Sequence, residues 1–204
     1  MDVDLAGHIN LLMHVCCGPC ATWPLLKGPG GGAASVTGLF YNPNIHPIDE
    51  FNRRRGGAAA LFKIAGRPLI VCDDYMEREW AGIGWAGLGR VGVSPPHEEN
   101  QAPARADGYT QRCAACYRMR LEYTAAYARD NGYDAFTTSL LISPYQNHGL
   151  IIEVCEGLSW RYGVGFYYHD YRPHFREGQK MAREAGLYRQ KYCGCIFSST
   201  YMHS

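Results

Sequence analysis

Seven of the nine cysteines in this 204-residue chain fall into three tight groups. The groups are Cys16, Cys17 and Cys20; Cys113 and Cys116; and Cys193 and Cys195. Cysteines this close in sequence rarely form structural disulfides, because a disulfide requires a Cβ geometry that near neighbours strain. A metal centre has no such restriction, since it gathers several thiolates around one point. The spacing therefore predicts metal binding rather than disulfide bonds.

The first two groups have the spacing of ligands to one centre. In the segment CCGPC we expect Gly18 to let the backbone bend, and the helix that follows to lower the pKa of the thiols. The second group lies at the start of a predicted helix, where residues three apart emerge on nearly the same face. Four thiolates, those of Cys16, Cys17, Cys113 and Cys116, suffice for a [4Fe-4S] cluster. This leaves a three-sulfur set with an open coordination position, as a catalytic metal requires, made of Cys20, Cys193 and Cys195.

Other interpretations of the cysteines remain open from spacing alone. A closed zinc site also uses tetrahedral sulfur ligation, so the spacing does not separate zinc from iron–sulfur chemistry. A redox dithiol needs one C-x-x-C pair and does not account for seven clustered thiols. Cys72 and Cys155 stand alone in apolar surroundings and are interpreted as core residues.

Several other classes of protein are disfavoured by the sequence. The chain has no run of eighteen or more apolar residues, and its first residues lack the cationic start and apolar stretch of a signal peptide. We therefore expect a cytoplasmic protein that does not span a membrane. Neither G-x-x-x-x-G-K-S/T nor G-x-G-x-x-G follows a predicted strand, so ATP and nicotinamide cofactors are not expected.

The elements that must position the cysteines alternate between strands and helices. Strands are predicted at 9–15, 35–41, 68–72, 135–141 and 165–169, with the clearest helix at 111–131 and another at 146–162. A further helix should follow Pro47, with Asp49 and Glu50 in its first turn. This alternation predicts one α/β domain over residues 1–204, with a mostly parallel sheet covered by helices on both faces. The Gly- and Pro-rich stretch 82–108 is expected to be an irregular excursion.

In such a sheet the reactive loops gather at the carboxyl ends of the strands. The cysteine segment 16–20 follows the first strand, loop 42–47 the second, loop 143–146 the fourth, and Asp170 the fifth. We expect these segments along one rim. His14, on a central strand, is interpreted as a core histidine with satisfied hydrogen bonds.

Basic residues are concentrated near the C-terminus although the net charge is only +1. Between Tyr171 and Tyr192 two acidic residues accompany six basic ones, Arg172, Arg176, Lys180, Arg183, Arg189 and Lys191. A second basic run is formed by residues 53–55. Such runs are typical either of a solvated helix face or of contacts to phosphate groups.

Five sequence blocks carry a more specific signal. They are residues 12–22 (LMHVCCGPCAT); 41–47 with Glu50 and Arg54; Arg112, Cys113, Cys116, Tyr117, Arg120, Leu121, Thr124 and Ala125; 136–141 with 143–146; and 186–190 with 192–198. In this order the blocks resemble the QueH family of epoxyqueuosine reductases, and they span most of the chain.

The resemblance implies a Rossmann-like domain that carries a [4Fe-4S] cluster beside a separate iron ion. Transferred position by position, it implies the cluster ligands Cys16, Cys17, Cys113 and Cys116. It implies Cys193, Cys195 and the residue at Cys20 as ligands of the second iron. Some family members have Asp at this last position, so the thiolate of Cys20 departs from their pattern.

The activity that the resemblance implies is the reductive deoxygenation of epoxyqueuosine to queuosine at the wobble position of tRNA, the last step of queuosine biosynthesis. Electrons would come from an external ferredoxin- or flavodoxin-like donor, and Cys20 would act in catalysis through the second iron. The candidate proton donors, all expected at the rim, are His46, Tyr145 and Asp170. Aromatic faces and cations suit a single-stranded anticodon loop, and the candidate contacts are Arg54, Tyr188, Arg189, Lys191 and Tyr192.

Two other functions stay open alongside the reductase. One is a zinc-stapled tRNA-binding module without catalysis. The other is a tRNA sulfur-transfer enzyme, which would normally need an ATP site to activate the base.

Overall fold

The computed structural model describes residues 9–29, 34–75 and 111–195. Within these ranges five strands form one sheet: β1 (Ile9–His14), β2 (Ala34–Phe40), β3 (Leu69–Val71), β4 (Ala135–Thr138) and β5 (Gly165–Phe166). All neighbouring strands pair in parallel, in the order β3-β2-β1-β4-β5. This order is that of Rossmann-like folds. The predicted α/β class with a parallel sheet is confirmed.

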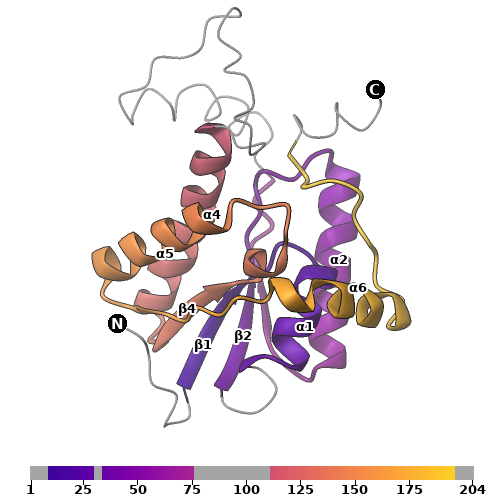
Figure 1. The fold of residues 1–204 in the computed structure, drawn as a ribbon, viewed down its shortest axis with the longest axis horizontal. Helices are drawn as coiled ribbons and strands as arrows, with labels where there is room; N and C mark the ends of the chain where they lie inside the picture. Colours follow the sequence, from indigo (N-terminus) through magenta and orange to yellow (C-terminus); the bar gives the residue numbers. More distant parts are fainter. Residues whose placement is uncertain (1–8, 30–33, 76–110, 196–204) are drawn as a thin grey trace, which may run out of the picture.

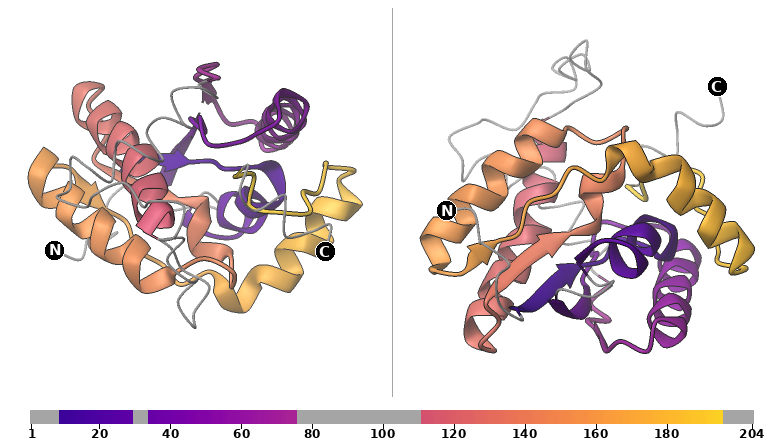
Figure 2. Two further views of the ribbon diagram at one scale, coloured as in Figure 1. Left: turned by 90° about the horizontal axis from the view of Figure 1, so that it is seen from above. Right: turned by 60° about the horizontal axis from the view of Figure 1, so that its bottom comes forward.

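Helices cover both faces of the sheet (Figures 1 and 2). They are α1 (Gly18–Leu26), α2 (Ile48–Ile64), α4 (Gln111–Asp130), α5 (His148–Tyr162) and α6 (Phe175–Glu184). Side chains of β1 alternate between the two cores, with Leu12 under α4 and α5, and Leu11 and Met13 under α1 and α2. Helix α6 packs on α1.

The predicted elements are largely confirmed, although β1, β3, β4 and β5 are shorter than expected. Helix α2 has Asp49 and Glu50 in its first turn, as predicted. Strand β4 ends at Thr138, whose hydroxyl accepts the Leu140 N–H and thereby begins a 3₁₀ turn, η3 (Ser139–Ile142). Strand β5 has two residues where five were predicted. The predicted excursion 82–108 lies outside the described residues. In the described part of the chain, no helix has both the length and the apolar character needed to cross a bilayer.

Gly18, at the start of α1, packs against the backbone of α2. A Cβ at this position would lie 2.7 Å from the carbonyl oxygen of Gly57. Gly18 does not have a positive φ angle. Glycine is therefore required here by helix packing, and the prediction that it serves to bend the backbone is wrong.

The substitution Gly18→Ala is expected to lower the free energy of unfolding by about 1–3 kcal/mol, because a backbone carbonyl has little room to move aside. Urea unfolding of the purified chain measures the effect. The matched control is Gly56→Ala on α2, where a Cβ would meet nothing within 4 Å. Alanine there should leave stability unchanged or raise it by up to about 1 kcal/mol. Equal effects of the two substitutions would contradict the packing argument.

Candidate metal centre and active site

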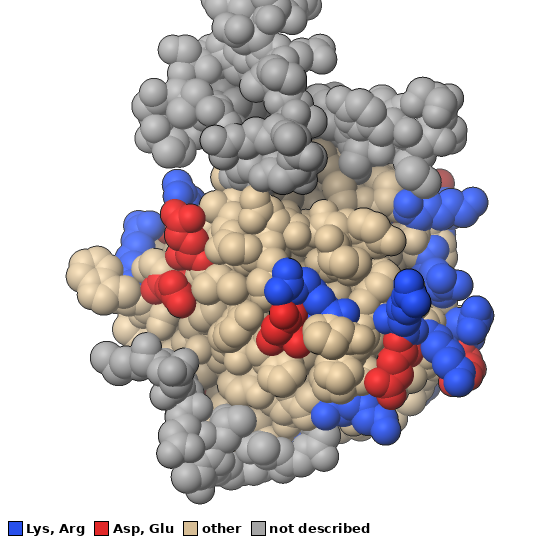
Figure 3. Space-filling view, viewed as in Figure 1, with Lys and Arg blue, Asp and Glu red and all other residues tan. Residues whose placement is uncertain are grey.

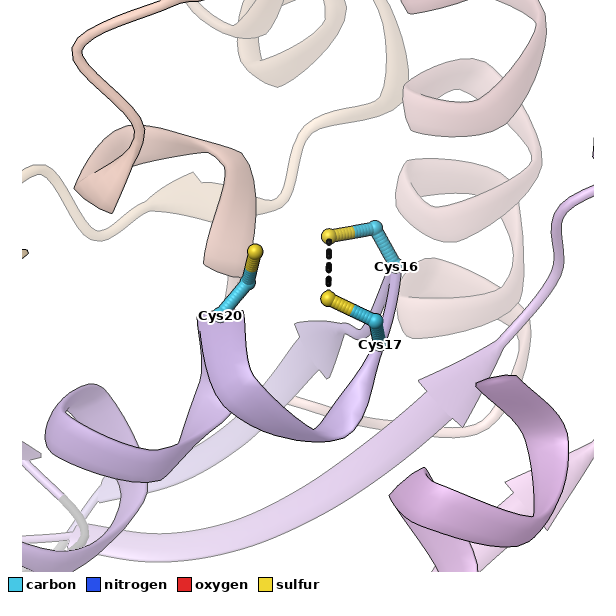
Figure 4. A group of neighbouring side chains, drawn as sticks. All are labelled: Cys16, Cys17 and Cys20. Carbon is cyan, nitrogen blue, oxygen red and sulfur yellow. Dashed lines mark hydrogen bonds between the residues drawn. The ribbon is translucent and has the colours of Figure 1, made fainter. Parts of the chain in front are cut away.

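Three cysteine sulfurs meet where β1 passes into α1. Cys16 and Cys17 follow the end of β1, Cys20 lies in the first turn of α1, and all three side chains are buried. Their sulfurs lie within 4.8 Å of one another, with 3.7 Å between Cys16 and Cys17, and Figure 4 shows them directed into one shared space. Sulfurs bound to one ion at about 2.3 Å in a tetrahedron are about 3.8 Å apart. This sulfur trio (Cys16, Cys17 and Cys20) therefore has the spacing of metal ligands.

Only one sulfur of the trio is readily ionised by its protein surroundings. Hydrogen bonds from Cys17, Cys20 and Ser139 hold the pKa of Cys16 well below its usual value. The pKa of Cys17 is raised by burial, and that of Cys20 by its hydrogen bond to Cys16. The prediction that this segment ionises readily is therefore right for Cys16 alone. A bound metal cation would supply the positive charge that three adjacent thiolates need.

Ser139 holds Cys16 in place, and His14 is buried at the end of the preceding strand. Ser139, at the start of η3, accepts the Cys16 N–H at 3.1 Å and donates to its sulfur at 3.4 Å. His14 is fully buried, with its ring nitrogens 2.9 Å from the hydroxyl of Thr138 and 3.3 Å from the carbonyl oxygen of Tyr41. Burial lowers the pKa of His14 to about 4, so its ring is neutral at physiological pH. His14 is thus the core histidine that was predicted, whereas the role of Ser139 was missed.

Cys116 lies within electrostatic range of Cys113, Cys193 and Cys195. Cys116, on α4, is buried, and burial raises its thiol pKa to about 12. Arg120 opposes this rise in pKa, whereas the charges of Cys195, Cys193 and Cys113 contribute to it. Among the described residues, however, the sulfur trio is the one group of three potential ligands that all lie within 4.8 Å of one another. Cys20 therefore groups with Cys16 and Cys17, and its assignment to a second metal with Cys193 and Cys195 stays a prediction.

The C-terminal segment, residues 188–195, lies against the sulfur trio and loop 42–47. The Gln190 side-chain amide donates a hydrogen bond to the Cys20 sulfur at 3.3 Å. The N–H of His46 donates to the carbonyl of Gly194 at 2.9 Å, and the Tyr192 hydroxyl donates to the carbonyl of His46 at 2.5 Å. Gly194 has a φ angle of 98°, a conformation that favours glycine between the two flanking cysteines.

Arg54 connects α2 to the C-terminal segment. Its side chain is 2% exposed, and its Nε donates to Glu50 Oε1 at 2.7 Å. The two terminal nitrogens donate to the carbonyls of Cys193, at 3.0 Å, and Tyr192, at 2.7 Å. This burial argues against the predicted contact of Arg54 with tRNA. The sequence signal was misleading because Arg54 lies between two other arginines in a basic run.

Exposed basic residues lie on α6 and on the C-terminal segment. They are Arg176, Lys180, Arg183, Arg189 and Lys191. Figure 3 shows Lys and Arg side chains gathered on the side of the molecule where α2 and α6 lie in Figure 1. Tyr188 donates to Glu50 at 2.5 Å, and Arg53 lies 5.6 Å from the centre of its ring. Arg189 and Lys191 are thus accessible, whereas the hydroxyls of Tyr188 and Tyr192 are engaged within the protein.

The three predicted proton donors lie in different surroundings. His46 is 1% exposed in loop 42–47, and Tyr145 is 82% exposed. Asp170 accepts two hydrogen bonds from the Arg172 guanidinium, at 2.8 and 2.7 Å, which lower its pKa to about 2. Asp170 is therefore ionised at neutral pH, which argues against it as a proton donor. The roles of His46 and Tyr145 stay predictions.

Fold and site together define an α/β protein with a buried group of three cysteines at the carboxyl ends of the strands of a parallel sheet. The protein-family model described as "Epoxyqueuosine reductase QueH" matches residues 11–201. The chain belongs to this family.

Known relatives resemble this chain over most of its length. A protein named Epoxyqueuosine reductase QueH from Dehalococcoides mccartyi is 35% identical, with 93% of this chain and 92% of that protein covered. Proteins of the same name from Thermotoga maritima and Streptococcus pyogenes are 31% and 30% identical, each over 93% of this chain. Of those two proteins, 90% and 70% are covered.

Proposed function

We propose that this chain reduces epoxyqueuosine in tRNA to queuosine, the last step of queuosine biosynthesis. The observation that carries the proposal is the buried sulfur trio at the carboxyl end of the central strand β1. It occurs in a chain that matches the QueH family over residues 11–201. The chain also covers 92% and 90% of two relatives that bear the name of this reductase.

The sulfur donors fit an iron–sulfur centre. Soft thiolates are the ligands of such clusters, and Cys16, Cys17 and Cys116 offer buried sulfur donors. The cluster ligands would be Cys16, Cys17, Cys113 and Cys116, and a second iron would be held by Cys20, Cys193 and Cys195. When bound, these groups would supply single electrons from an external ferredoxin- or flavodoxin-like donor, and Lewis acidity at the site.

The residues of the chain would hold the substrate and supply protons. Loss of the epoxide oxygen breaks two C–O bonds, forms one C=C bond, and consumes two electrons and two protons, with water as the second product. His46 or Tyr145 would provide protons at the rim. The anticodon stem-loop would contact Tyr188, Tyr192 and the exposed cations Arg189 and Lys191.

The substitution Arg189→Ala is expected to weaken tRNA binding several-fold and to reduce the slope of log affinity against log salt by about 0.7–0.9, the share of one phosphate contact. Arg189 is exposed, and its Nε makes one 3.4 Å hydrogen bond to Gln179. Binding is measured by titration of labelled tRNA at several salt concentrations. The control is Arg129→Ala, a cation paired with Asp130 near the far end of α4. A salt slope equal to that of the unmodified chain would remove Arg189 from the RNA surface.

Turnover under anaerobic conditions tests the proposal. The purified chain, given a chemical reductant and tRNA that carries epoxyqueuosine, should yield queuosine in the digested RNA by mass spectrometry. Iron and sulfide should accompany this activity. The absence of queuosine with a fully iron-loaded protein would reject the reductase assignment.

A zinc-stapled tRNA-binding module is the second candidate. The 3.7 Å separation of the Cys16 and Cys17 sulfurs favours it, because that spacing suits a single tetrahedral ion. Such a protein would be colourless, contain zinc without sulfide, and bind tRNA without changing it.

A further inference from the structure

The two buried arginines near the cysteines differ in how their charges are balanced. Arg54 forms an ion pair with Glu50. Arg120, on α4, is 4% exposed, and no carboxylate of the described residues lies within ion-pair distance of it. Its Nε donates to the carbonyl of Cys116 at 3.2 Å, and its guanidinium lies 5.8 Å from the centre of the Tyr117 ring. Neither contact provides a negative charge.

Arg120 lies one helical turn after Cys116, whose carbonyl it contacts, and the groups near enough for their ionised forms to favour the Arg120 cation are mainly cysteines. They are the side chains of Cys116, Cys16, Tyr117 and Cys193. Cys16, Cys116 and Cys193 belong to the three separate cysteine groups of the sequence. Arg120 also lowers the pKa of His14, which places its charge near the end of β1. The buried cation therefore lies next to the Cys116 backbone on α4, near enough to Cys16 and Cys193 to interact with their charges.

An arginine buried without a carboxylate is unfavourable unless another negative group compensates it. If Arg120 only supported the packing of α4, an apolar side chain of similar length would serve better. Its placement among potential thiolates indicates that the compensating charge comes from the metal site. A cluster with four thiolate ligands gains a further negative charge on reduction, and a nearby fixed cation favours that reduced state.

We propose that Arg120 is the counter-charge of the thiolate metal centre and sets its reduction potential by stabilising the reduced state. This inference rests on the proposed function, since it requires a redox-active centre. Arg120 would act on the centre through its charge and would not contact the substrate.

The test compares the midpoint potential of the iron-loaded chain with those of its variants, all purified anaerobically. The potential is measured by optical titration with a graded reductant. Arg120→Met removes the charge and keeps a long side chain. Its reduction equilibrium constant should fall at least tenfold, which for one electron is a shift of about 59 mV to more negative potential. Arg120→Lys keeps the charge and should recover most of this shift. An unchanged potential in Arg120→Met would overturn the proposal.

A matched control is Arg118→Met, which removes an exposed cation from the same helix and should leave the potential unchanged. An equal shift in this variant would also overturn the proposal, since it would indicate an effect of net charge. If Arg120→Met does not assemble the centre, the iron and sulfide contents of the two Arg120 variants test the proposal instead. Arg120→Lys should then restore loading, and loss of loading in both variants would refute the role of the charge.

Failure of the inference is distinguishable from failure of the proposed function. An unmodified chain that contains zinc and no sulfide would reject the redox centre itself. A normal cluster whose reduction potential is unchanged in Arg120→Met would reject this inference and leave the proposed function intact.

Discussion

Replacing Cys116 with alanine is expected to abolish the iron–sulfur absorbance of the anaerobically purified chain and to lower turnover by about a thousandfold or more. Cys116 is buried on α4 within electrostatic range of the other cysteines, so an alanine there leaves a cluster ligand missing in a site with little access to water. Cys113→Ala should have the same effect. Absorbance, iron and sulfide content, and formation of queuosine are measured on the same preparation.

The cysteines of the C-terminal segment should behave differently. Cys193→Ala and Cys195→Ala are expected to keep the cluster absorbance and lose turnover, because they are assigned to the second iron. The control is Cys72→Ala, whose sulfur contacts the Tyr123 hydroxyl at 3.4 Å and takes no part in the proposed centres. It should retain both properties. If the α4 and C-terminal variants lost the same properties, the division into two centres would be wrong.

The substitution Arg54→Met is expected to lower the free energy of unfolding by about 3–5 kcal/mol, the usual loss when one partner of a buried ion pair is removed. Glu50, only 4% exposed, would lose its cationic partner, and the carbonyls of Tyr192 and Cys193 would lose their donors. Because these contacts hold the C-terminal segment, the variant should also lose the second iron. Chemical unfolding and iron analysis measure the two effects.

The neighbouring residue provides a matched control for Arg54. Arg55 forms an ion pair with Asp73 at the same 2.7 Å distance, but the side chains are 39% and 64% exposed. Arg55→Met should cost no more than about 1 kcal/mol and leave iron content unchanged. A similarly small loss for Arg54→Met would show that its contacts with the C-terminal segment are unimportant.

The fold was largely predictable because its signals are local. Buried strands of a parallel sheet are short apolar runs, and α4 shows its core face in the spacing of Tyr117, Leu121, Thr124 and Ala128, all of which are buried. The limits of β4 were not predictable from apolar character. Residues 139–141 are buried in the 3₁₀ turn just as they would be in a strand.

The site was predictable in its residue types and much less so in its contacts. Cysteine spacing identified Cys16, Cys17 and Cys20 as candidate ligands but divided them between two metal centres. The packing of α1 on α2 at Gly18 depends on residues far apart in sequence. The contacts of Arg54 likewise join residues far apart in sequence, whereas its place in a basic run suggested contact with RNA. Ser139, Gln190 and Arg120 lie within the blocks that resemble the QueH family, yet their contacts with the cysteine groups required the folded arrangement.

Anomalous X-ray scattering at the iron edge, from crystals of the anaerobically purified chain, tests the central claim most directly. The account predicts a four-iron cluster bound by Cys16, Cys17, Cys113 and Cys116, and a separate iron peak beside Cys20, Cys193 and Cys195. A single metal ion bound by Cys16, Cys17 and Cys20 together would contradict it.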